Sequence, residues 1–250
     1  MSRLTDAIVK KKQLIGTLVS VSSPSLAEAL SFSGLDWLFF DLEHSVMSLA
    51  DVQAMIQAMN PDCLSMVRIE DPQTVYAKRA LDTGCDALIV PQVNSADIAR
   101  AIVKAGKFPP AGERSVGLGR ALGYGTTLAQ GVKVENSRTS LIMQIEHTNA
   151  VEHVDEILKL EEVEAVFVGP YDLSGSFGIP GEIGNSRVQD AISSTLKSAR
   201  SASKPAGIFV GSAEAARKEL ARGFQIVAVS SDLATLAGSM RTICGEIRRG

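Results

Sequence analysis

An alternation of short apolar runs with longer segments of helical periodicity, repeated eight times, is the feature that most constrains the fold of this chain. The runs predicted as strands are 14–21, 37–43, 63–70, 87–93, 140–146, 165–170, 206–211 and 225–231. Several of the segments between them begin with Ser or Asn and end with Gly or Asn, as capped helices do. Eight such units in 250 residues match a (β/α)8 barrel in size. We therefore predict one α/β domain over residues 1–250, a single TIM barrel, with a doubly wound open sheet as the rival.

Charge and cysteine content disfavour several classes of protein. The formal net charge is −3 and the basic residues are scattered, so no electrostatic footprint for nucleic acid or an anionic membrane is visible. The three cysteines are far apart and lack C-x-x-C spacing, which argues against a disulfide framework and a structural zinc site. The N-terminal stretch has no apolar signal core, and no apolar run approaches the ~20 residues that span a bilayer. We predict a cytoplasmic protein with a small-molecule partner, and neither a nucleic-acid nor a membrane partner.

One irregular stretch, residues 107–139, interrupts the alternation and is long enough to suggest a function. Its glycines are spaced G-x-G-x-x-x-G, and they follow a helix and Pro109-Pro110 rather than a strand, which argues against a nucleotide-binding turn. The stretch connects a helix to the fifth strand. In a barrel it therefore emerges at the end opposite the active site.

Polar side chains gather toward the carboxyl ends of several predicted strands. In the second strand Trp37, Phe39 and Asp41 share the face that points into a barrel, because side chains alternate along a strand. Each polar residue taken alone has a structural explanation, such as a helix cap for Asp172 or an ion pair for Arg68. Their convergence at one end, where barrel enzymes hold their active sites, is not explained in that way. The residues at this end are Asp41, Glu43, His44, Arg68, Gln144, Glu146 and Asp172.

Two of these carboxylates form a candidate metal site. Glu146 and Asp172, with Gln144 nearby, offer the oxygen atoms that suit a hard divalent cation, which implies magnesium or manganese. His44 as a further ligand would favour zinc instead. Its position close to Asp41 is more typical of an oriented acid/base dyad.

Several motifs together resemble those of a known enzyme family. They are "FDLEHS", "VRIE", "VPQV", "PPAGERSVG", "MQIEH" and "FVGPYDLSGSFGIPG", and the match runs in order from about residue 14 to residue 232. The chain resembles the HpcH/HpaI family of class II pyruvate aldolases, which includes 4-hydroxy-2-oxoheptanedioate, 2-dehydro-3-deoxyglucarate and 2-keto-3-deoxy-rhamnonate aldolases. The resemblance implies a (β/α)8 barrel, usually a homohexamer, that reversibly cleaves a 4-hydroxy-2-oxo acid to pyruvate and an aldehyde. It also implies a divalent metal cation, Mg, Mn or Co.

The resemblance implies roles for residues at matching motif positions. Glu146 and Asp172 correspond to the metal ligands, and Asp41 and His44 to a catalytic proton-transfer dyad. Arg68 corresponds to a catalytic residue that contacts the keto oxygen. The expected substrate-binding residues are Gln144 beside the metal, the backbone of Tyr171 and Asp172 around the pyruvate carboxylate, and Glu43 in support.

Some positions depart from the family pattern or have no firm role. Tyr171 and His147 stand where small residues are expected; the Tyr171 ring could narrow the pocket, whereas His147 faces away from the metal by parity. The resemblance makes Arg114, Arg120 and Tyr124, in the stretch 107–139, candidates for contacting the aldehyde portion in a neighbouring subunit. The alternative is that this stretch only builds an interface between subunits.

The expected chemistry agrees with the residue types. Cleavage of a C–C bond beside a ketone develops enolate charge, which a metal ion and a guanidinium stabilise. The predicted strands contain no lysine, so an imine-forming aldolase is not expected. Decarboxylation of oxaloacetate or pyruvate at the same site is an alternative reaction. A noncatalytic barrel, a scaffold or sensor, is disfavoured because it has no use for several desolvated charges. Dicarboxylate-derived and sugar-derived aldehydes both remain open.

Overall fold

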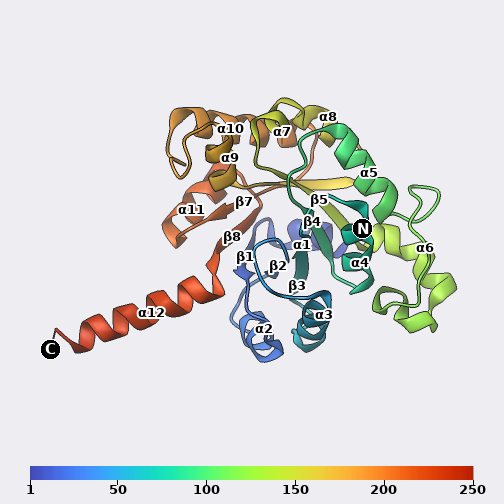
Figure 1. Cartoon of the computed structure of the whole chain (residues 1–250), viewed down its shortest axis with the longest axis horizontal. Helices are drawn as coiled ribbons and strands as arrows, with labels where there is room; N and C mark the ends of the chain where they lie inside the picture. The colour runs from blue at the N-terminus through green and yellow to red at the C-terminus, as the bar shows by residue number, and fades with distance from the viewer. Residues whose placement is uncertain (250) are drawn as a thin grey trace.

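The computed structural model describes residues 1–249 and contains a closed barrel of parallel strands, β1 to β8 (Figure 1). Each strand pairs with its neighbours in sequence, and β8 closes the barrel by pairing with β1. Helices alternate with the strands and surround them. The predicted (β/α)8 barrel is confirmed, and the open sheet is excluded, because closure leaves no edge strand unpaired.

Every strand overlaps one of the predicted runs. The bounds are Leu14–Val19 for β1, Trp37–Asp41 for β2, Leu64–Arg68 for β3, Ala87–Val90 for β4, Ser140–Ile145 for β5, Val163–Val168 for β6, Ala206–Val210 for β7 and Ile226–Ser231 for β8. Most predicted runs extend past the strand at its carboxyl end. Those extra residues belong to the loops that form the mouth of the barrel.

The helices begin, for the most part, at side chains that cap them. Ser23, Ser48, Ser95 and Ser212 each accept a hydrogen bond from a backbone N–H of the first turn. The bounds are α1 Arg3–Lys11, α2 Pro24–Ser31, α3 Leu49–Ala58, α4 Thr74–Asp82, α5 Ala96–Gly106, η1 (a 3-10 helix) Arg120–Gly125, α6 Leu128–Arg138, α7 Thr148–Glu152, α8 Val154–Leu158, α9 Pro170–Ser176, α10 Ser186–Ser201, α11 Ala213–Arg222 and α12 Asp232–Ile247. Within residues 1–249, no helix has both the length and the apolar character needed to cross a membrane.

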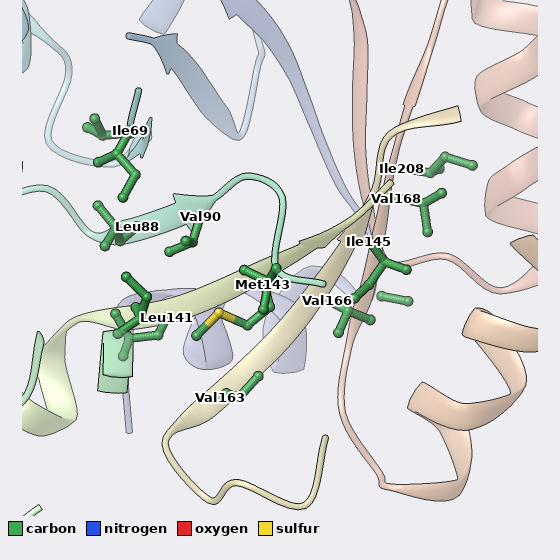
Figure 2. Packing of buried hydrophobic residues seen from close by; sticks show 14 of the residues in the cluster. Ile69, Leu88, Val90, Leu141, Met143, Ile145, Val163, Val166, Val168 and Ile208 are labelled. Atoms are coloured by element: carbon green, nitrogen blue, oxygen red, sulfur yellow. The ribbon is translucent and has the colours of Figure 1, made fainter. Parts of the chain in front are cut away.

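The side chains of the strands divide between two apolar layers, as their alternation predicts. Trp37 and Phe39 point into the barrel, where the Phe39 and Phe167 rings meet edge to face with centroids 5.6 Å apart. Leu38 and Phe40, the residues between, pack in the outer layer beneath the helices. Figure 2 shows part of this outer layer on β4, β5 and β6, including Val90, Met143, Ile145 and Val166. The inner layer fills the barrel, so functional groups are confined to its ends.

The stretch 107–139 is less irregular than predicted, because it contains η1 and α6. It lies at the amino ends of the strands, as expected. Arg138, at the end of α6, donates a hydrogen bond to the carbonyl oxygen of Cys85 just before β4. The stretch therefore packs at the end of the barrel opposite its mouth.

Candidate active site

The predicted site residues lie together at the carboxyl ends of the strands. Asp41 and Arg68 are the last residues of β2 and β3 and pair directly in the strand register. Gln144 lies near the end of β5, and Glu146 follows that strand immediately. Asp172 lies in the first turn of α9, which follows β6. The mouth of the barrel therefore collects residues that are far apart in sequence, as barrel enzymes do.

Arg68 is held between two acidic side chains. Its Nε and Nη2 atoms donate to the two oxygens of Asp41 at 2.9 and 2.8 Å, and Nη1 lies 3.1 Å from Oε2 of Glu43. All three side chains are almost fully buried. Burial acts to lower the pKa of Arg68, but the hydrogen bond and charge of Asp41 outweigh it and raise the pKa. The guanidinium is thus a fixed positive charge with a set orientation.

The predicted pairing of the Asp41 and His44 side chains is wrong in this structure. Both Asp41 oxygens bind Arg68, and from His44 the carboxylate accepts only the backbone N–H, at 3.3 Å. The imidazole instead lies with Nε2 3.7 Å from Oε2 of Glu43, and its side chain is 63% exposed. The physical reason is that a bidentate guanidinium pair occupies the carboxylate more strongly than a neutral imidazole would. Burial raises the pKa of Glu43, against the opposing charge of Arg68.

Glu146 is a buried carboxylate whose hydrogen bonds come from amide groups rather than from a cation. Its Oε1 accepts the backbone N–H of Gln92 at 2.7 Å, and its Oε2 accepts a hydrogen bond from Nε2 of Gln144. Burial raises its pKa to about 7, against those two hydrogen bonds, and the charges of Glu43 and Asp172 raise it further. A carboxylate in this position is stabilised by a cation that binds it.

The residues around Glu146 fit a divalent cation. Oε1 of Gln144 is buried and has no hydrogen-bond partner, so one acceptor beside Glu146 is unsatisfied. Asp172 is exposed on the same rim and adds a second carboxylate. Among residues 1–249, no three His, Cys, Asp or Glu side chains form a metal-binding group. A cation held by two carboxylates and an amide oxygen would keep several waters, which suits Mg²⁺ and related ions.

Two residues of this site were missed by sequence reasoning. Gly169 follows β6, and a Cβ atom there would lie 2.8 Å from Oε2 of Glu146, so only glycine leaves the carboxylate its room. Gln92 supplies the backbone N–H described above and also donates from Nε2 to Oε1 of Glu43 at 3.3 Å. The two residues fall in the motifs "VPQV" and "FVGP". Their roles depend on a backbone N–H group and on the absence of a side chain, so the residue types alone do not indicate them.

A cavity of about 230 Å³ opens beside these groups and is the candidate substrate pocket. Its polar lining comes from His44, Arg68, Gln144 and Asp172. Its apolar lining comes from Leu18, Phe39, Phe167, Gly169, Pro170, Tyr171 and Phe209. A small pocket with aromatic walls and a few charged groups at one end suits a short organic acid.

Of the two residues that depart from the family pattern, Tyr171 lines the candidate pocket and His147 does not. The Tyr171 side chain lines the cavity and is 62% exposed, so it stands at the rim and narrows the opening. His147 caps the start of α7, where its Nδ1 accepts the backbone N–H of Asn149 at 3.1 Å. It does not line the cavity.

The two arginines predicted to contact the aldehyde portion are held elsewhere. Arg114 is buried, with Nη2 2.7 Å from Asp82 and Nη1 3.7 Å from Glu135. Arg120 donates to the carbonyl oxygens of Thr83 and Gly84, at the amino end of the barrel. In this chain both arginines are therefore held by contacts at the amino end of the barrel, and their contact with a substrate in a neighbouring subunit stays a prediction. Tyr124 remains exposed.

Fold and site together define a class: a (β/α)8 barrel enzyme with acidic, amide and guanidinium groups at the carboxyl ends of its strands. The model of the HpcH/HpaI aldolase/citrate lyase family matches residues 14–238. The chain belongs to this family, and it is an aldolase, a carbon–carbon lyase.

Individual relatives agree with this assignment. A 2-keto-3-deoxy-L-rhamnonate aldolase of Escherichia coli O157:H7 is 36% identical over 230 residues, which cover 91% of this chain and 86% of the relative. A crystal structure of an HpcH/HpaI aldolase/citrate lyase family protein from Burkholderia cenocepacia J2315 superimposes with a TM-score of 0.94 at 30% identity, covering 99% and 100% of the two chains. An HpcH/HpaI aldolase from Desulfitobacterium hafniense DCB-2 gives 0.90 at 28% identity, covering 98% and 96%.

Proposed function

We propose that the protein is a divalent-metal-dependent aldolase that reversibly cleaves a 4-hydroxy-2-oxo acid to pyruvate and an aldehyde. The observation that carries this proposal is the pair formed by the buried Glu146 carboxylate and the unsatisfied Oε1 of Gln144, at the mouth that also holds Arg68. A buried anion beside an unpaired acceptor is unfavourable unless a cation binds there. The guanidinium nearby is suited to an anionic substrate.

Glu146 and Asp172 would hold the cation, with Gln144 beside it. When bound, such a cation supplies Lewis-acid polarisation of the keto oxygen. We propose Mg²⁺, Mn²⁺ or Co²⁺, because the donor atoms are all oxygens.

Arg68 would stabilise the negative charge that develops on the keto oxygen during cleavage. Its contacts with Asp41 use one N–H each of Nε and Nη2, so the guanidinium, which has five N–H groups, retains donors for a substrate. The ion pairs with Asp41 and Glu43 fix its direction before the substrate arrives. Such fixed donors contribute strongly to transition-state stabilisation because they need no reorientation.

His44 would transfer the proton of the substrate, and the start of α9 would bind its carboxylate. His44 is exposed at the mouth and lines the pocket, so it can take and return the proton of the substrate 4-hydroxyl group. The backbone N–H groups of Tyr171 and Asp172 lie in the first turn of α9, where helix N–H groups lack internal partners. We propose that they bind the pyruvate carboxylate.

The lysines support a mechanism without an imine. Lys107 is buried and burial lowers its pKa, as an imine-forming lysine would require. However, its Nζ donates to the carbonyl oxygens of Asn136 and Thr139 at 2.7 Å, in the stretch that packs at the amino end of the barrel. No lysine lines the candidate pocket within the described part of the chain.

For the aldehyde half, we propose an uncharged, sugar-derived group rather than one that carries a second carboxylate. Arg68 and His44 are the only cationic or ionisable basic side chains that line the pocket of the described chain, and Arg114 and Arg120 are bound elsewhere. A second carboxylate would have no partner in this chain. The related enzyme named for 2-keto-3-deoxy-L-rhamnonate fits this choice.

A pyruvate-release assay tests the function. The purified protein is expected to release pyruvate from a 2-keto-3-deoxy sugar acid faster than from a 4-hydroxy-2-oxo dicarboxylic acid of similar length. Chelation should abolish the release, and Mg²⁺, Mn²⁺ or Co²⁺ should restore it. Full activity of verified metal-free protein, or trapping of an imine by borohydride, would contradict the proposal. Pyruvate formed from oxaloacetate alone would favour the decarboxylase, and no pyruvate from any substrate would favour a noncatalytic barrel.

We also propose that the active form is a homo-oligomer and, as the family resemblance implies, a hexamer. The exposed apolar surface of α12 supports association between copies.

A further inference from the structure

The candidate pocket runs from a buried floor to an exposed rim. Arg68 and Gln144 line it at the floor and are 7% and 2% exposed. Among residues 1–249, the exposed members of its lining are His44, Tyr171 and Asp172. Asp172 is the proposed partner of the cation. His44 and Tyr171 therefore remain available for the part of a substrate that lies outside the floor.

The order of groups in a 4-hydroxy-2-oxo acid sets which part of it reaches this rim, a step that rests on the proposed function. The carbons that become pyruvate include the keto group, which Arg68 and the cation would bind at the floor. Carbon 4 carries the hydroxyl group whose proton His44 would take, and this carbon becomes the aldehyde. The atoms beyond carbon 4 therefore extend past His44 toward the rim, where Tyr171 stands.

The Tyr171 ring lies against the loop that follows α9. A Cβ atom on Gly181 would lie 3.9 Å from Cε1 of the ring, so the loop backbone and the ring are close. Gly181 has a φ of +84°, in the left-handed region that suits glycine. The Oγ of the buried Ser174 donates to the carbonyl oxygen of Tyr171 at 2.6 Å and accepts the N–H of Gly181 at 2.9 Å. One hydroxyl group thus fastens the loop to the residue that carries the ring.

Further contacts hold this loop in place. The carbonyl oxygen of Ser174 accepts the N–H of Ile179 at 3.1 Å. The Arg187 guanidinium, on α10, lies over the Phe177 ring, 4.8 Å from its centroid. These contacts give the later part of the motif "YDLSGSFGIPG" a structural role behind Tyr171. A ring that is held in place before binding loses little conformational entropy when a ligand packs on it.

The chemistry of the tyrosine side chain suits one class of aldehyde. Its ring has an apolar face and a polar hydroxyl group at its edge, and it carries no charge near neutral pH. A sugar-derived aldehyde likewise combines C–H groups with hydroxyl groups. A second carboxylate at this place would lie close to the carboxylate of Asp172, the next residue, and like charges repel.

We propose that the Tyr171 side chain selects the aldehyde: its ring forms the outer wall of the pocket, and an uncharged hydroxyaldehyde packs against it. The residue is 62% exposed before binding, so part of the ring is free for a ligand. A small residue, as the family pattern has at this position, would leave the rim open. Tyr171 is thereby a specificity-determining residue for the aldehyde half, in addition to the backbone contact proposed for the pyruvate half.

Aldol condensation, the reverse of cleavage, tests the role of the ring. Pyruvate and saturating Mn²⁺ are supplied with glyceraldehyde, a hydroxyaldehyde, or with acetaldehyde, which has only a methyl group beyond its carbonyl carbon. Tyr171→Ala is expected to lower kcat/KM for glyceraldehyde about tenfold relative to acetaldehyde. Because both rates come from one protein sample, their ratio is independent of the folded fraction and of the steps on pyruvate that both reactions share.

Two further variants separate the ring from its hydroxyl group and from the loop. Tyr171→Phe keeps the ring and should keep the ratio within about twofold of wild type, because an exposed hydroxyl group exchanges a bond to water for one to the ligand. Ile183→Ala, the matched control, removes an apolar side chain of the same loop that does not line the pocket, and the ratio should not change. A loss in either of these variants equal to that in Tyr171→Ala would overturn the inference.

A bulky aldehyde should give a result in the opposite direction. The Tyr171 ring obstructs the entry of benzaldehyde, whereas its removal widens the opening of the cavity of about 230 Å³. Tyr171→Ala is expected to raise kcat/KM for benzaldehyde about tenfold over wild type. General damage to the site would lower this value instead. A value no higher than that of wild type would contradict the assignment of the ring as a wall.

These outcomes distinguish the inference from the proposed function. If wild type condenses pyruvate with glyceraldehyde and Tyr171→Ala keeps the wild-type ratio, the inference alone is overturned. If wild type condenses pyruvate with none of the three aldehydes, the proposed function is overturned and the inference with it.

Discussion

Glu146→Gln is expected to abolish aldol cleavage and, at the same time, to stabilise the metal-free protein at pH 8. Gln keeps the size and the hydrogen-bonding capacity of the side chain but removes the charge that binds the cation. Loss of such a charge from the site should cost on the order of a thousandfold in rate. Activity is measured by coupled pyruvate detection with Mn²⁺ added well above the wild-type requirement.

The stability effect follows from the raised pKa. Glu146 has a pKa of about 7 in the folded protein, above the ordinary value of 4.5, so the folded state binds more protons than the unfolded state between these values. The stability that the protonated carboxyl group contributes is fully present below pH 4.5 and is lost as the pH rises through 7. The loss is on the order of 3 kcal/mol, because one pKa unit corresponds to about 1.4 kcal/mol. Glu146→Gln cannot ionise and escapes this loss.

Urea unfolding with a chelator at pH 5 and pH 8 measures the difference. The variant should resemble wild type at pH 5 and exceed it at pH 8. Glu156→Gln, an exposed residue of α8, is the control for replacing any glutamate and should match wild type at both values. A variant that is no more stable than wild type at pH 8, or that still cleaves substrate, would show that Glu146 is not the buried metal ligand we propose.

The second large effect is expected for Arg68→Ala, and its comparison with His44→Ala separates the two roles. Without Arg68, every step that passes through the enolate should slow by roughly a hundredfold, about 3 kcal/mol, including exchange of pyruvate methyl protons with solvent. His44→Ala should slow C–C cleavage strongly but affect methyl-proton exchange less, because the histidine serves the 4-hydroxyl proton. The two rates are measured by coupled pyruvate detection and by NMR, with metal saturating.

The structure predicts that these two variants also differ in stability. Arg68→Ala leaves Asp41 and Glu43 buried without their partner, which typically costs about 3–5 kcal/mol. His44 is exposed, so its removal should change stability by no more than about 0.5 kcal/mol. Arg68→Lys retains the charge and serves as the folded control if Arg68→Ala unfolds. Wild-type exchange in the Arg68 variants, or wild-type cleavage in His44→Ala, would refute the role assigned to that residue.

Much of the fold could be read from local patterns. Strand and helix periodicities depend on neighbouring residues, so eight units were visible without any tertiary information. The alternation Trp37-Leu38-Phe39-Phe40 likewise separated the barrel interior from the helical layer, because a strand has only two faces. Most predicted strands extend past the observed carboxyl ends, because the polar residues at the mouth continue the alternation into the loops.

The candidate site was predicted as a set of residues but not as a set of contacts. The sequence places Asp41 three residues from His44, and proximity favoured a dyad. The folded barrel brings Arg68 beside Asp41 through the register of β2 and β3, and the guanidinium takes both carboxylate oxygens. The family resemblance made Arg114 a candidate for contacting the aldehyde portion in a neighbouring subunit. Its ion pairs with Asp82 and Glu135 come from α4 and α6, which no local pattern connects.

Local periodicity and side-chain chemistry are enough to predict the barrel, the end at which its polar residues gather and the residue types available for an aldolase. The contacts among those groups come from the folded chain. The fold placed the N–H of Gln92 on Glu146, left Oε1 of Gln144 unpaired and turned α12 away from its own barrel. These features depend on strand register and backbone conformation. Such properties arise between elements that are distant in sequence, where no local pattern records them.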